Sequence, residues 1–116
     1  MFQVEPKPTF AVNVPLTVPG LPEPVSVVIT FRYKNKAQLT QFLASGAGKE
    51  DHVLLHELIV SWSGFIGPDG HEVPYSFAVL QVVAQNHWNA VDEISTAYLN
   101  ELKVAKTKNS RRLPAA

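Results

Sequence analysis

The stretch VSVVITFRYKNKAQLTQFLAS, residues 25–45, decides the fold because the spacing of its apolar side chains changes part-way along. Over residues 25–33 every second residue is apolar, which is the spacing of a half-buried strand. Leu39 and Phe42 then recur at the spacing of one helical face, which predicts a helix over residues 36–45. A strand that leads directly into a helix predicts an α+β fold.

The segment before this stretch predicts a second strand. Residues 9–18, TFAVNVPLTV, alternate in the same way, and Pro15 places the strand at a sheet edge because proline donates no ladder hydrogen bond. The linking PGLPEP is dense in turn residues, so we expect an N-terminal antiparallel β-hairpin from about Thr9 to Tyr33. Two strands alone are marginal in water, so helices must cover the apolar face.

Three or four helices account for that cover. Residues 53–62, VLLHELIVSW, follow helical spacing, although a strand remains open for their β-branched portion. Residues 77–86, FAVLQVVAQN, are apolar nearly all round and predict a buried central helix that Ser76 caps. A last helix is expected from about residue 88 to residue 106, with acids in its first turn and lysines in its last.

Length and composition favour a single globular domain over residues 1–116. Hydrophobic content is 46% and charged content 17%, and we expect residues 1–8 and 107–116 to be flexible tails. With no cysteine, disulfides, thiolate catalysis and cysteine zinc sites are excluded, and a reducing cytoplasm is the expected location. The first residues lack the pattern of a signal peptide, and no apolar run is long enough to span a membrane.

The net charge of zero conceals an asymmetry between the body and the C-terminal end. Residues 103–116 carry five basic side chains and no acidic one, whereas the rest of the chain carries all ten acids. Basic tails bind nucleic acid in some proteins, so a nucleic-acid or regulatory binding module is the alternative function. More often such a tail solvates a helix end, where positive charge also suits the helix dipole.

Two stretches resemble phosphate or zinc motifs without completing them. SGAGKED has Leu43 where a phosphate-binding loop needs glycine, and Glu50 where it needs serine or threonine. HELIV has Val60 where a zinc-protease helix needs its second histidine. Neither motif therefore predicts a cofactor.

His52 and His56 share a helical face, with Glu57 nearby, and are the remaining candidates for a metal or catalytic site. No third ligand is evident, and a metal needs a full, oriented shell. We therefore expect no metal, no cofactor and no enzymatic activity.

Residues 62–76, WSGFIGPDGHEVPYS, combine aromatic side chains with a Pro-Asp-Gly turn and predict a structural elbow that launches the helix over residues 77–86. Apolar side chains at or near this elbow are candidates for contact with a partner, because aromatic residues dominate interface energetics. These candidates are Trp62, Phe65, Ile66, Tyr75 and Trp88. The alternative, that all five close the core beneath the turn, remains open.

The order of these segments resembles the small tail assembly chaperones of long-tailed bacteriophages and prophages. The resemblance covers roughly Val25 to Asn109, and its most telling piece is a W-x-G, D-G, V-P-Y-S pattern. That pattern comprises Trp62, Gly64, Asp69, Gly70, Val73, Pro74, Tyr75 and Ser76.

The resemblance implies a non-enzymatic role in tail morphogenesis in the bacterial host cytoplasm. Such chaperones coat the tape measure protein, help to recruit tail tube subunits and are not retained in the virion. Weak homo-oligomers are expected, while membrane and nucleic-acid partners are not.

Overall fold

The computed structural model describes residues 1–46 and 48–115, with side chains up to residue 103. The predicted flexible tail at residues 107–116, and with it the alternative function based on basic side chains there, lies outside the residues whose side chains are described.

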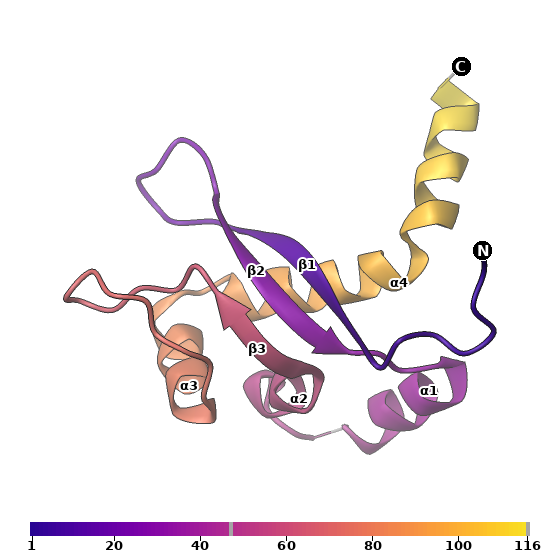
Figure 1. Cartoon of the computed structure of the whole chain (residues 1–116). Coiled ribbons are helices and arrows are strands. Elements are labelled where there is room, and N and C mark those ends of the chain that lie inside the picture. The colour runs from indigo at the N-terminus through magenta and orange to yellow at the C-terminus, as the bar shows by residue number, and fades with distance from the viewer. Residues whose placement is uncertain (47, 116) are drawn as a thin grey trace.

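The chain folds around a three-stranded antiparallel sheet in the order β1-β2-β3 (Figure 1). β1 (Thr9–Leu16) and β2 (Val25–Arg32) form the N-terminal hairpin, and β3 (Ile59–Ser63) pairs with the other side of β2. The predicted hairpin and α+β class are confirmed. Pro15 lies in β1, which is an edge strand as its missing N–H requires.

Within the described residues, four helices follow the hairpin: α1 (Lys36–Ser45), α2 (Asp51–Leu58), α3 (Phe77–Asn86) and α4 (Ala90–Ala115). Asn35 caps α1, because its side chain accepts from the Gln38 backbone while the Gln38 side chain accepts from the Asn35 N–H. Figure 1 shows α4 passing behind the sheet, while α2 and α3 lie beside β3.

The core lies between one face of the sheet and the helices. Tyr98 on α4 is at its centre, with ring-centroid distances of 5.0 Å to Phe31 and 5.6 Å to Phe10. The Tyr98 hydroxyl donates to the Arg32 carbonyl at 2.9 Å, so its polar end is satisfied. The buried core cluster comprises Val14, Val27, Ile29, Phe31, Phe42, Leu55, Leu58, Ile59, Trp62, Leu80, Ile94 and Tyr98.

The helix predicted over residues 53–62 is correct only as far as Leu58. Its remainder forms β3, the alternative left open for the β-branched portion. The Arg32 guanidinium donates to the carbonyl oxygens of Glu57 and Ile59 at 3.1 Å each, so these groups need no helical partner. The second edge of β2 supplies the ladder that Ile59 and the following residues join, and no local pattern could reveal that pairing.

The prediction that residues 77–86 form a buried central helix is wrong in its burial. The helix itself is correct, and Ser76 caps it by accepting from the Val79 N–H at 3.2 Å. However, Leu80 is its only buried residue, and Val82 is 56% exposed. α3 is therefore a peripheral helix that carries apolar side chains on an outer face.

A polar contact fastens the loop end of the hairpin to α4. The Thr17 backbone N–H donates to Glu93 Oε1 at 3.0 Å, and the Thr17 hydroxyl donates to Glu93 Oε2. Thr17 directly follows β1, and Glu93 lies in the first turn of α4, where a carboxylate also suits the helix dipole.

Candidate functional site

The elbow, residues 62–76, is built around the side chain of Trp62. The indole is 8% exposed and stacks on Phe65, with a centroid distance of 3.7 Å. Tyr75 meets its edge at 4.8 Å, and the indole N–H donates to the Val73 carbonyl at 3.0 Å. Since the indole contacts both arms of the elbow, it fixes their separation.

Backbone bonds hold the same two arms together. The Val73 N–H donates to the Phe65 carbonyl at 2.7 Å, and the Gly67 N–H donates to the His71 carbonyl at 2.9 Å. Gly64 has a φ of 91°, a conformation that favours glycine, and its N–H donates to Glu72 Oε1 at 2.7 Å. The interpretation of residues 62–76 as an elbow agrees with this geometry, although the element that precedes it is β3 and not a helix.

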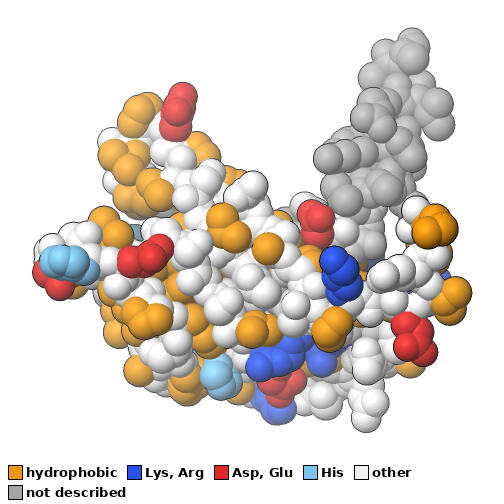
Figure 2. Space-filling model, in the orientation of Figure 1, with side chains coloured by type: hydrophobic (Ala, Val, Ile, Leu, Met, Phe, Trp, Pro, Cys, Tyr) orange, Lys and Arg blue, Asp and Glu red, His pale blue; other side chains and the backbone are white. Residues whose placement is uncertain are grey.

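A groove of about 500 Å³ lies between the elbow and α3. No lining residue carries a formal charge when His87 is neutral, and Figure 2 shows apolar side chains gathered over α3 and the elbow. We call this the α3 groove. It is lined by Phe65, Ile66, Gly67, Pro68, Val73, Val79, Val82, Val83, Asn86 and His87.

Each wall of the groove carries one large apolar side chain that is well exposed. Ile66 of the elbow is 70% exposed, and Val82 of α3 is 56% exposed. Sequence reasoning selected Ile66 but missed Val82, because a helix that is apolar nearly all round predicts burial on every side. The glutamines at positions 81 and 85 are the signal that was available, since they mark a solvent-facing side.

Three of the five predicted contact residues meet in the elbow stack, namely Trp62, Phe65 and Tyr75. Ile66 adjoins them at the groove. Trp88 is not part of this assembly: it is 96% exposed, and although it follows the groove residue His87, it does not line the groove. Trp62 therefore closes the core beneath the turn, whereas Ile66 and Trp88 are exposed to solvent.

Tyr75 connects the back of the elbow to α2. Its hydroxyl lies 2.7 Å from His56 Nδ1, and the two rings stack at 5.9 Å. Burial raises the pKa of the Tyr75 hydroxyl, and the positive charge of Arg32 partly offsets that rise. Tyr75 therefore holds the elbow in place and faces away from the groove lining.

His52 and His56 both pack on the first residue of α3, Phe77. The Phe77 ring lies 5.8 Å from the His52 ring and 4.7 Å from the His56 ring. His52 Nδ1 is also 3.4 Å from a Glu50 carboxylate oxygen. Within the described part of the chain, no three His, Asp or Glu side chains are grouped so that they could hold a metal ion.

At the level of whole sequences, a family model described as phage tail assembly chaperone matches residues 1–109. No curated protein and no solved structure matches the chain. Among the helices in the described residues, none has the length and apolar character needed to cross a membrane.

Proposed function

Because the chain belongs to the phage tail assembly chaperone family, we propose that it binds the tape measure protein through the α3 groove and helps to recruit tail tube subunits during tail morphogenesis. It keeps the tape measure soluble and is not retained in the virion. The observation that carries this proposal is an uncharged groove with accessible apolar side chains on both walls, in a chain of this family.

The groove suits an amphipathic helix of an extended partner. Its volume of about 500 Å³ accommodates a few apolar side chains, and helices of this kind dock by laying an apolar face into such a groove. Ile66 and Val82 stand at opposite walls, where an inserted side chain covers both. Since no lining residue is charged when His87 is neutral, affinity should depend little on salt.

The groove walls are held before any partner arrives. The stack on Trp62 fixes the elbow wall, and Leu80, which is fully buried, anchors the α3 wall. Binding therefore requires little ordering of this chain, which lowers its entropic cost. Trp88 offers a second contact beside the groove, because an exposed tryptophan gains more from burial than most side chains.

The direct test is co-expression with the tape measure protein from the same genome, with the soluble fraction of that protein as the readout. Phe65 is a poor position for a variant because its ring supports Trp62. Ile66→Glu and Val82→Glu place a charge in the groove without removing a buried residue. Leu21→Glu on the hairpin loop is the matched control, since Leu21 is 52% exposed and lies outside the groove.

We expect the wild type and Leu21→Glu to keep the tape measure soluble and to co-purify with it. The Ile66→Glu, Val82→Glu double variant should lose the complex while it still unfolds cooperatively, with a melting temperature only a few degrees below that of the wild type. The groove is the wrong surface if this variant co-purifies as well as the wild type. The chaperone proposal itself fails if the tape measure is equally soluble without this protein and no complex appears at tens of micromolar.

A further inference from the structure

The free edge of β1 presents backbone groups that point away from the sheet. The Tyr33 N–H donates to the Pro8 carbonyl at 2.8 Å, which makes Pro8 and Tyr33 a hydrogen-bonded pair of the hairpin. Hydrogen bonding alternates along an antiparallel ladder. The backbone N–H and C=O groups of even-numbered residues of β1 therefore bond to β2, whereas those of odd-numbered residues point away from the sheet. Within the described residues, no backbone group bonds the outward N–H and C=O groups of Thr9, Ala11 and Asn13.

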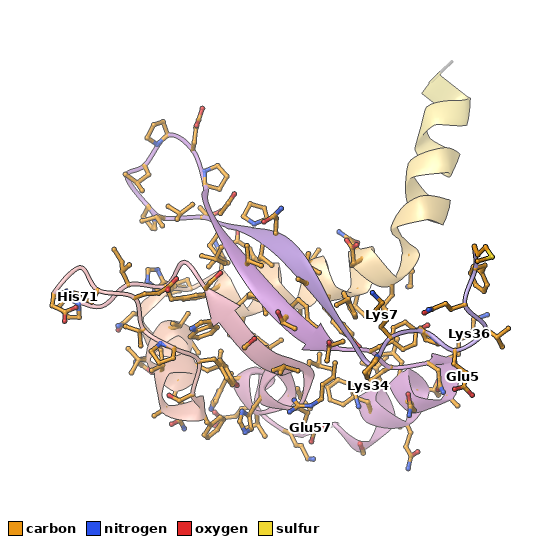
Figure 3. All side chains as sticks on the ribbon, in the orientation of Figure 1. Glu5, Lys7, Lys34, Lys36, Glu57 and His71 are labelled. Carbon is orange, nitrogen blue, oxygen red and sulfur yellow. The ribbon has the colours of Figure 1, made fainter. Side chains whose placement is uncertain are left out.

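Beside this edge there is space between β1 and α4. A hollow of about 370 Å³ at the Pro15 end is lined by α4 residues that include Ala97. A second hollow, of about 290 Å³, lies at the Thr9 end between residues 6–10 and Leu102. Figure 3 shows Lys7 beside α4 at this end. An added strand would thus have α4 beneath it.

The N-terminal arm, residues 1–8, has the pattern of such a strand. All eight residues are exposed, and two of them, Phe2 at 94% and Val4 at 92%, are large apolar side chains on alternate positions. The prolines occupy positions 6 and 8, so residues 3, 5 and 7 keep the N–H groups that one edge of a strand requires. The family match begins at residue 1 and therefore includes the arm.

We propose that two copies of this chain exchange their arms, each adding residues 3–7 as an antiparallel strand to the β1 edge of the other. Gln3, Glu5 and Lys7 lie opposite Asn13, Ala11 and Thr9 of the second copy. This register is symmetric about Pro8, so one two-fold axis relates both arms and closes the dimer.

The same register places the apolar side chains of the arm on the α4 side of the sheet and its prolines at positions that need no N–H. Phe2 falls opposite Val14 and Val4 opposite Val12, so both apolar side chains face α4, with Phe2 near the hollow beside Pro15. Pro6 and Pro8 fall on positions that donate nothing to the new ladder. Each exchanged arm gains about six backbone hydrogen bonds. The occupant is a second copy because the complementary sequence is this chain's own arm.

Two variants remove the arm and block the β1 edge separately. Deletion of residues 2–7 removes the arm and leaves the edge. Ala11→Pro blocks the edge by removing an outward N–H, and it costs no bond to β2, as Pro15 already shows at an equivalent position. Ala11→Ser is the matched control because it keeps the N–H. None of these changes affects the α3 groove, so the outcome is independent of tape measure binding.

Sedimentation velocity from 5 to 300 µM should show a reversible dimer for the wild type and for Ala11→Ser. Each blocked variant alone should be monomeric, with a dimer Kd raised at least about tenfold. An equimolar mixture of the two should form a heterodimer through the one arm and one edge that remain intact, with a Kd between those of the wild type and the single variants. Exchange is refuted if the wild type is monomeric throughout, if it grows beyond a dimer, if the arm deletion dimerises normally, or if the mixture stays monomeric.

Cysteine pairing provides a second measurement if Ala11→Pro unfolds the chain, because the protein has no cysteine of its own. Directly opposite Cα atoms in such a ladder are about 5.5 Å apart, within reach of a disulfide. Mixing the Glu5→Cys and Ala11→Cys chains under mild oxidation should give a disulfide-linked dimer. Glu5→Cys mixed with Ser63→Cys, on the opposite edge of the sheet, is the control. Equal yields from both mixtures would contradict the register.

Discussion

Replacement of Leu80 and of Val82 by alanine tests whether α3 is a peripheral helix with an open outer face. Leu80 is fully buried, so Leu80→Ala removes apolar contacts and leaves a cavity, at a cost of about 3 kcal/mol in the free energy of unfolding. Full burial of a valine contributes about 1.5 kcal/mol, and Val82 is 56% exposed, so Val82→Ala should cost at most about 0.7 kcal/mol.

Urea denaturation followed by circular dichroism measures both changes in the free energy of unfolding, and thermal melts give the corresponding changes in melting temperature. For a chain of this size, Leu80→Ala should lower the melting temperature by roughly 10 °C and Val82→Ala by about 3 °C or less. The protein should be kept near 5 µM so that self-association does not add to the measured free energy of unfolding. Costs that agree within about 0.5 kcal/mol, or a Val82→Ala cost above about 1.5 kcal/mol, would show that α3 is buried on both sides.

Three further predictions concern capping, alkaline pH and metals. Ser76→Ala should cost about 1 kcal/mol in urea denaturation, because the first turn of α3 loses its cap, whereas Ser76→Asp should restore it; equal costs for both would contradict the capping role. Burial raises the pKa of the Tyr98 hydroxyl above 10, so its neutral form stabilises the fold below pH 10 and that contribution is lost as pH rises through the folded-state pKa. Tyr98→Phe should therefore cost about 1 kcal/mol at pH 7, through the hydrogen bond to Arg32, yet flatten the fall in stability above pH 10; an unchanged alkaline slope would refute this. Zinc or nickel at modest excess should leave the melting temperature unchanged, and a rise of several degrees abolished by His56→Ala would establish a metal site.

The elements that could be predicted are those whose signal is local. Alternation of apolar residues over residues 9–18 and 25–33 gave the hairpin, and Pro15 gave its edge position. Helix starts were also readable where a capping side chain precedes them, as at Ser76. Each of these features depends on neighbours within a few residues, which is the range over which spacing and capping act.

The errors arose where a distant segment decides the structure. β3 forms because β2 has a second edge to fill, and β2 is about thirty residues earlier in the chain. α3 is exposed on one side because nothing in the described part of the chain covers Val82, and composition cannot reveal a missing neighbour. For the candidate site, the sequence identified the elbow wall through Ile66 but not the α3 wall.

The position of Tyr98 affects how the protein is made in the cell. Its ring fills the space beneath Phe10 and Phe31, and its hydroxyl bonds the end of β2, yet it is synthesised more than sixty residues after that strand. The hairpin therefore leaves the ribosome with its apolar face uncovered and remains so until α4 emerges. Released chains that stop before residue 98 should therefore be more sensitive to protease and to capture by cellular chaperones than the full-length chain.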